Sequence, residues 1–138
     1  VQARRDRALS EVDVAIRWRT QIGDFEVDVT GDARFFDRFV RCDDGRWRVL
    51  ERTAIYEKDR IDAVRPSLLF GLAYARMRFD KYPAECRHLA LALERAGFRL
   101  AHVVTAYSEE ETALRSAAAR WLDACETESV PERAALRL

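Results

Sequence analysis

The stretch EVDVAIRWRTQIGDFEVDV, residues 11–29, decides the fold, because apolar and polar side chains alternate along it almost without a break. From Val12 to Ile22 the even positions carry mainly apolar side chains, and the odd positions carry mainly charged ones. A period of two residues is typical of a β-strand with one buried face. This strand is about twice the usual length, which favours a strongly curved sheet.

Turn signals divide the residues around this strand into a meander. Gly23-Asp24 predicts a turn after the first strand, and Asp43-Asp44-Gly45 predicts a hairpin after the second. A third strand is expected from Arg46 through Tyr56. We therefore predict three antiparallel strands over residues of about 8–60.

The second strand contains an irregularity. Gly31-Asp32 interrupts its alternation, and the apolar phase has changed when the pattern resumes at Phe35-Phe36. A phase change beside a glycine is typical of a β-bulge, which bends a strand and redirects its side chains.

After Asp62 the pattern changes from strands to helices. Helices are expected at about 66–78, 83–96 and 108–125. Pro66 and Pro83 suit first helical turns, and Ser108 with Glu111 forms a capping box. A short extended piece is expected between Phe98 and Ala106.

Strands followed by helices predict an α+β fold with a curved antiparallel sheet. Residues 1–125 are expected to form one domain, and residues 126–138 a frayed tail. Nothing helical precedes the first strand to cover the apolar sheet face. Either the C-terminal helices cover it or a second copy does, so a homodimer is expected.

Composition excludes several classes of partner. Lys plus Arg and Asp plus Glu both number 24, so no general basic field would recruit nucleic acid. No apolar run approaches the roughly 20 residues of a membrane span, and no secretory signal is recognisable. A cytoplasmic protein without membrane contact is the expectation.

The residues that bind metals and cofactors give no usable pattern. Cys42, Cys86 and Cys125 are widely spaced, which favours free thiols in a reducing compartment. His88 and His102, the two histidines, lie in separate predicted elements, so no metal is expected. A glycine-rich phosphate loop is also missing, and no cofactor is predicted.

Several segments resemble the SnoaL-like branch of the nuclear transport factor 2-like (NTF2-like) superfamily, over residues of about 5–124. The segments are Gly31-x-x-x-Phe35-Phe36-Asp37, Asp44-Gly45-Arg46-Trp47, Arg52, Tyr56-Glu57-Lys58-Asp59-Arg60-Ile61-Asp62, Tyr82-Pro83 and Arg87-His88-Leu89-Ala90. The resemblance implies a cone-like sheet wrapped against N-terminal helices, with a pocket between them. The resemblance therefore implies that this chain is the C-terminal part of such a domain, without those helices. Ala63 also stands where these relatives usually have proline.

The superfamily includes dehydratases, isomerases, polyketide cyclases and epoxide hydrolases, as well as proteins without catalytic activity. The resemblance implies that catalytic members use no metal or organic cofactor, and that Asp, His or Tyr in an apolar cavity transfers protons.

The candidate catalytic residues are Tyr56, Glu57, Asp59 and His88. A carboxylate in an apolar cleft has a raised pKa and can exchange protons near neutral pH, and histidine suits the same chemistry. The structural alternative is a strand end with local ion pairs, together with a histidine that only packs.

The candidate substrate-binding residues are Arg52, Trp18, Phe36 and Trp47. Arg52 could bind an anionic or carbonyl group, or it could form a structural ion pair with Asp37 across the hairpin. The three aromatic residues could shape a cavity for a ring-bearing ligand, or they could simply belong to the core.

Three functional hypotheses remain open. The first is a cofactor-free lyase, isomerase or cyclase for a small apolar or polycyclic carbonyl compound. In this hypothesis Glu57 or Asp59 accepts a proton from the substrate, and Tyr56 or His88 donates one. Arg52 orients the substrate. The second is a non-catalytic ligand-binding or dimerisation module. The third is a truncated reading frame without an independent function.

Overall fold

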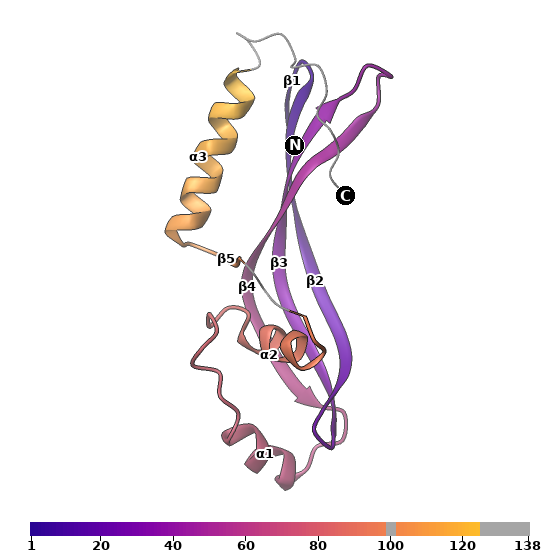
Figure 1. Cartoon of the computed structure of the whole chain (residues 1–138), viewed down its shortest axis with the longest axis vertical. Helices are drawn as coiled ribbons and strands as arrows, with labels where there is room; N and C mark the ends of the chain where they lie inside the picture. Colours follow the sequence, from indigo (N-terminus) through magenta and orange to yellow (C-terminus); the bar gives the residue numbers. More distant parts are fainter. Residues whose placement is uncertain (99–101, 125–138) are drawn as a thin grey trace.

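The computed structural model describes residues 1–98 and 102–124. The elements are β1 (Gln2–Arg4), β2 (Arg7–Ile22), β3 (Phe25–Arg41), β4 (Trp47–Ala63), α1 (Leu68–Ala75), α2 (Arg87–Arg95), β5 (Val104–Thr105) and α3 (Glu109–Asp123). These five strands form one sheet in sequence order (Figure 1). The predicted α+β class, a curved sheet followed by helices, is confirmed.

The sheet is antiparallel from β1 to β4, whereas β5 pairs with β4 in parallel. Within the described part of the expected extended piece between Phe98 and Ala106, the structure has the strand β5, and residues 99–101 lie outside the described residues. The predicted tail at residues 126–138 also lies outside the described residues.

The first two helices are shorter than predicted. Ser67 is the N-cap of α1, and its side chain accepts a hydrogen bond from the Phe70 N–H, so Pro66 lies outside the helix. Pro83 belongs to a turn in which the Cys86 N–H donates to its carbonyl, and α2 begins only at Arg87. The third helix matches its prediction closely, with Ser108 as N-cap.

The register corrects the interpretation of Gly31-Asp32 as an interruption. β2 and β3 pair continuously from Arg7 opposite Val40 to Ile22 opposite Phe25, straight through Gly31. The register shifts instead lie between β3 and β4, at Asp32/Ala33 and at Arg38/Phe39. Glu57 is the extra residue in β4 at the first shift, so the bulge is real but belongs to the next strand.

The change of apolar phase in β3 comes from the helices that cover the sheet. We call residues 7–14, 33–41 and 47–57 the α3 end of the sheet, and residues 15–22, 25–32 and 58–63 the α2 end. At the α2 end, Val27 and Val29 are buried on the side of α2, whereas at the α3 end Phe36 is buried on the side of α3. Since side chains alternate along a strand, the two helices cover opposite faces of the sheet.

Two separate hydrophobic cores result from this arrangement. The core under α3 contains Leu9, Phe36, Ile55, Val104, Ala106, Ala118 and Leu122. The core under α2 contains Ile22, Val27, Val29, Ile61, Leu89 and Ala92. Figure 1 shows α3 beside one end of the long strands, and α1 and α2 beside the other.

The switch of covered face overturns the expectation that Val12 is buried with Ile22. Val12 lies on the uncovered face of the α3 end and is 50% exposed. Trp47 and Val49 share that face through their pairing with β3, and both are exposed. Among the residues that the structure describes, no helix has the length and apolar character needed to cross a bilayer.

Candidate functional site: Asp59, His88 and Tyr74

Asp59 of β4 and His88 of α2 form a buried hydrogen-bonded pair. The Nδ1 atom of His88 lies 2.7 Å from Oδ1 of Asp59, and the side chains are 5% and 1% exposed. The other carboxylate oxygen, Oδ2, accepts the backbone N–H of Leu89 at 2.7 Å. Both oxygens of Asp59 are therefore occupied.

The second of these bonds makes Asp59 the cap of α2. The N-cap residue Cys86 makes no side-chain cap hydrogen bond, and no acidic residue lies in the first helical turn. A carboxylate from the sheet takes over that function, because it accepts a free N–H and lies at the positive end of the helix dipole. The cap holds His88 against the strand.

Tyr74 of α1 completes a chain of three side chains. Its hydroxyl lies 2.9 Å from Nε2 of His88. A carboxylate can only accept, so the Nδ1 of His88 carries a proton toward Asp59. In the neutral imidazole Nε2 then holds a lone pair, and the Tyr74 hydroxyl donates to it.

Two aromatic rings contact the imidazole of His88. The Phe79 ring meets the imidazole edge-on with centroids 4.8 Å apart, and the Tyr74 ring stacks on it at 5.9 Å. Phe70 and Phe25 extend this aromatic wall toward the β2–β3 hairpin. His88 thus packs against aromatic rings, and its Nε2 has the Tyr74 hydroxyl as hydrogen-bond partner.

The helix that carries Tyr74 is only lightly attached. α1 has no buried residue, and it exposes Leu68, Leu69 and Leu72. Phe70 and Tyr74 pack against the core under α2. Tyr74 therefore reaches His88 from a helix that has no buried residue of its own.

Tyr56 and Cys86 lie close to this site. Burial, with a smaller electrostatic contribution from Cys86, raises the pKa of the Tyr56 hydroxyl. Burial and the neighbouring carboxylates of Asp59 and Glu85 raise the pKa of the Cys86 thiol to about 11. Both groups keep their protons at neutral pH.

Glu57, by contrast, belongs to a different cluster. Its Oε1 accepts from Nε of Arg34 at 2.7 Å. The cluster, here called the α3 ion network, consists of Glu11, Arg34, Glu57, Glu111 and Arg115. The structure thus separates Glu57 from Asp59 and His88, because the bulge gives Glu57 no partner residue in β3.

The α3 ion network lowers the pKa values of two glutamates. The hydrogen bond from Arg115 lowers the pKa of Glu11, against an opposing effect of burial. Burial raises the pKa of Glu111, but hydrogen bonds from the Tyr107 N–H and from Arg115 outweigh it, and the net shift is downward. These carboxylates remain ionised and are unsuited to accept protons at neutral pH.

The predicted partner of Arg52 is present. Nε and Nη2 of Arg52 bind the two oxygens of Asp37 at 2.7 and 2.8 Å. The guanidinium also lies over the Phe35 ring, 4.6 Å from its centroid. Arg52 faces solvent on the uncovered face of the α3 end, away from His88.

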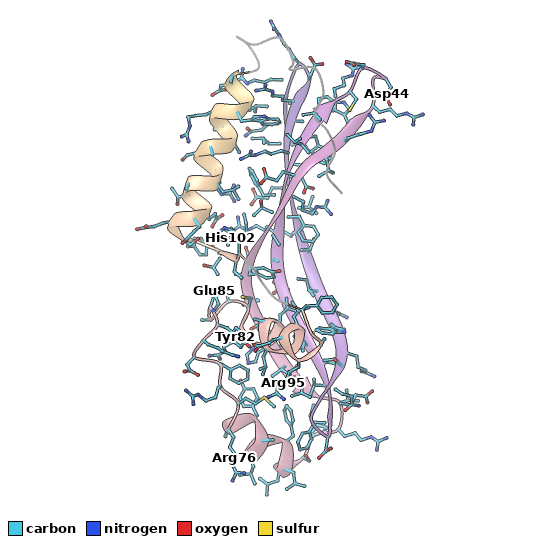
Figure 2. The ribbon with its side chains drawn as sticks, viewed as in Figure 1. Asp44, Arg76, Tyr82, Glu85, Arg95 and His102 are labelled. Carbon is cyan, nitrogen blue, oxygen red and sulfur yellow. The ribbon has the colours of Figure 1, made fainter. Side chains whose placement is uncertain are left out.

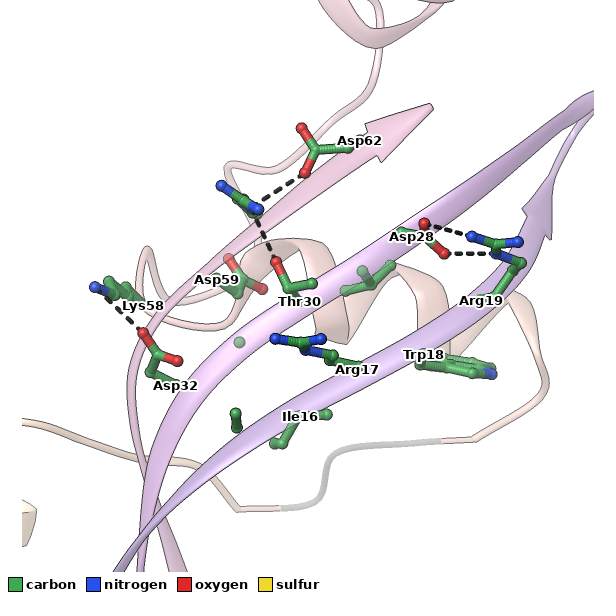
Figure 3. A pocket seen from close by; sticks show the side chains of 14 residues that line it. Ile16, Arg17, Trp18, Arg19, Asp28, Thr30, Asp32, Lys58, Asp59 and Asp62 are labelled. Atoms are coloured by element: carbon green, nitrogen blue, oxygen red, sulfur yellow. Dashed lines mark hydrogen bonds and ion pairs between the residues drawn. The ribbon is translucent and has the colours of Figure 1, made fainter. Parts of the chain in front are cut away.

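The three aromatic candidates do not share a cavity. Phe36 belongs to the core under α3, and Trp47 lies exposed at the start of β4. Trp18 packs partly against the core under α2 and also lines an open groove of about 790 Å³ over the α2 end (Figure 3).

Tyr74 was missed by the sequence reasoning. Its spacing of four residues from Phe70 indicates only that both lie on one helix face. The contact with His88 joins residues 14 positions apart across a turn, and no local pattern predicts that pairing. Figure 2 shows the side chains that lie between the helices α1 and α2 and the sheet.

Among residues 1–98 and 102–124, no group of three or more His, Cys, Asp or Glu side chains is placed to hold a metal ion. Comparison with known proteins gave no family model and no curated protein that matches this chain.

Proposed function

We propose that the chain is a small-molecule-binding domain that performs acid–base chemistry, without a cofactor, on an apolar carbonyl compound. The hydrogen-bonded chain Asp59–His88–Tyr74 carries this proposal. In it His88 is the base, Tyr74 the hydrogen-bond donor to the substrate oxygen, and Asp59 the residue that positions His88. Such a proton transfer is a step by which a cofactor-free lyase, isomerase or cyclase can act on a carbonyl compound.

The resemblance to SnoaL-like proteins of the NTF2-like superfamily supports the same class of reaction. The proposed base is His88 and not Asp59 or Glu57. Both oxygens of Asp59 already accept hydrogen bonds, and Glu57 belongs to the α3 ion network. The aromatic wall of Phe70, Tyr74 and Phe79 suits an apolar or polycyclic ligand. Such a ligand would separate the Tyr74 hydroxyl from Nε2 of His88 and then accept the hydrogen bond of that hydroxyl itself.

The elimination reaction of 5-nitrobenzisoxazole tests the proposal without knowledge of the natural substrate. A base removes the ring C–H proton, the N–O bond breaks, and a coloured cyanophenolate forms. We expect the protein to accelerate this reaction, and His88→Gln to remove the acceleration. The control is His102→Gln, which changes the other histidine, an exposed residue between α2 and β5.

Two results would contradict a catalytic His88. One is an unchanged rate in His88→Gln, and the other is an equal loss in both histidine variants. A thermal melt of each variant checks that the variant is folded under the conditions of the rate measurement.

A non-catalytic ligand-binding or dimerisation module is the second candidate function. It is favoured by the burial of His88 and by the apolar side chains left uncovered at the α3 end. In this case a homodimer pairs the uncovered faces of two copies. The free thiols of Cys42 and Cys86 support a cytoplasmic location for either function.

A further inference from the structure

The groove over the α2 end is lined by charged side chains from three strands, on the sheet face opposite His88. The pairing of β2, β3 and β4 arranges them in three cross-strand rows (Figure 3). The rows are Arg19–Asp28–Asp62, Arg17–Thr30–Arg60 and Ala15–Asp32–Lys58.

The carboxylates in the two outer rows are already paired. Nε and Nη2 of Arg19 bind the two oxygens of Asp28 at 2.7 and 2.8 Å. Lys58 lies 3.2 Å from Asp32. In the first row Asp62 lies 3.1 Å from Nε of Arg60, so none of these three carboxylates is left for Arg17.

The middle row is different, because it holds two guanidinium groups and no carboxylate. Arg17 is exposed and makes no hydrogen bond or ion pair within the part of the chain that the structure describes. Thr30 stands between the two arginines and accepts a hydrogen bond from Nε of Arg60 at 3.1 Å. Its hydroxyl proton therefore remains available to a further acceptor.

The charges of the groove leave one positive charge in excess. Four cations, Arg17, Arg19, Lys58 and Arg60, face three carboxylates, Asp28, Asp32 and Asp62. Asp59 also lines the groove, but its carboxylate is turned to the opposite face, where His88 and Leu89 occupy it. The excess is located at Arg17.

We propose that the middle row binds the oxyanion group, a carboxylate or a phosphate, of a small ligand that lies in this groove. Guanidinium groups recognise such planar or tetrahedral oxyanions by paired hydrogen bonds, and Thr30 supplies one more donor. Neighbouring strands lie about 4.8 Å apart, so Arg17 and Arg60 can reach one anion above Thr30 from both sides. The groove volume of about 790 Å³ holds a small molecule.

The test is an NMR titration of the ¹⁵N-labelled protein at low, constant ionic strength, because salt screens exposed charges. Inorganic phosphate and acetate are titrated separately, while the Arg17 Nε–H and Thr30 N–H signals are followed. We expect saturable shifts at both residues, with a Kd on the order of 1 mM. The oxyanion that binds more tightly identifies the ligand group as phosphate or carboxylate.

Two variants test whether the NMR shifts come from anion binding to the middle row. Arg17→Gln should weaken binding about tenfold, and Thr30→Val should weaken it less, because it removes one neutral donor. The control is Arg46→Gln, which changes an exposed arginine in the β3–β4 hairpin and should leave the affinity unchanged.

The proposal is overturned if neither anion gives a saturable shift at about 20 mM, well above the expected Kd. It is also overturned if Arg17→Gln binds as tightly as the parent protein, or if Arg46→Gln weakens binding equally. These outcomes are independent of the reaction proposed for His88, because the groove lies on the other face of the sheet.

Discussion

Asp59 accepts hydrogen bonds from two buried donors, the imidazole of His88 and the backbone N–H of Leu89. Asp59→Ala would leave both donors without a partner. A buried donor left unsatisfied costs about 1–3 kcal/mol, so we expect the free energy of unfolding to fall by roughly 3 kcal/mol. Urea unfolding followed by circular dichroism measures this loss.

Asp62→Ala is the matched control, because Asp62 lies on the same strand, three residues further on and mostly exposed. Its removal should change the free energy of unfolding by less than about 0.5 kcal/mol. Asp59→Asn keeps one acceptor oxygen and should lie between the two. Similar losses for Asp59→Ala and Asp62→Ala would show that Asp59 does not cap α2.

The Cys86 thiol should be inert in the folded protein. It is fully buried, and burial together with Asp59 and Glu85 raises its pKa to about 11, so thiolate is scarce at pH 8. Native protein and the Cys86→Ala variant should therefore release the same amount of thiolate product from a disulfide reagent. After unfolding in urea, the parent protein should release one equivalent more. A difference before unfolding would contradict this prediction.

At the scale of elements, α3 depends on its first turn. The Ser108 hydroxyl accepts the Glu111 N–H at 3.1 Å, as the capping box predicts. Ser108→Ala should lower the free energy of unfolding by about 1 kcal/mol. Ser116→Ala, in the exposed middle of the same helix, should cause no loss, because alanine is the better helix former there. Urea titrations of both variants measure the free energy of unfolding. Equal losses in the two variants would contradict the capping of α3 by Ser108.

The α3 ion network should make stability depend on pH in the acid range. The folded pKa of Glu111 lies below its ordinary value of 4.5, as does that of Glu11. A lowered carboxylate pKa stabilises the fold fully above the unfolded value, and this contribution disappears as pH falls through the folded value. The free energy of unfolding should therefore decrease below about pH 4.5.

Glu111→Gln tests this assignment. It should destabilise the protein at pH 7, and the difference from the parent should shrink as the pH is lowered to about 3, where Glu111 itself becomes protonated. The control is Glu109→Gln, in the exposed first turn of α3. A constant difference between Glu111→Gln and the parent across this pH range would contradict the predicted linkage.

Sequence reasoning succeeded for elements with strong local signals. The strands, their hairpins and the start of α3 follow from alternation, turn residues and a capping box, and Asp37 was identified as the partner of Arg52. The pairing of Asp59 with His88 depends on how α2 lies on the sheet, which no local pattern encodes. Likewise, the bulge at Glu57 decides which carboxylate of the Tyr56–Arg60 run reaches His88.

At the scale of the whole molecule, the sheet is covered on opposite faces at its two ends. This arrangement explains why the apolar phase changes in β3 although its pairing with β2 is unbroken. Within residues 1–98 and 102–124, it also leaves two sheet surfaces that no helix covers, and they differ in character. The one at the α2 end is the charged groove, whereas the one at the α3 end exposes apolar side chains.

The apolar surface leads to a prediction about assembly. Val12, Trp47 and Val49 lie on one face of the α3 end and are 40–50% exposed. If two copies pair through this face, light scattering should give the mass of a dimer at micromolar concentration. Val12→Lys would bury an unpaired charge in the dimer interface, which is costly because the charge loses its hydration. This variant should therefore have the mass of a monomer. Leu69→Lys, on the exposed side of α1, should leave the dimer intact, since that leucine lies at the other end of the sheet. A monomeric parent protein, or a dimer that Val12→Lys does not dissociate, would refute pairing through this surface.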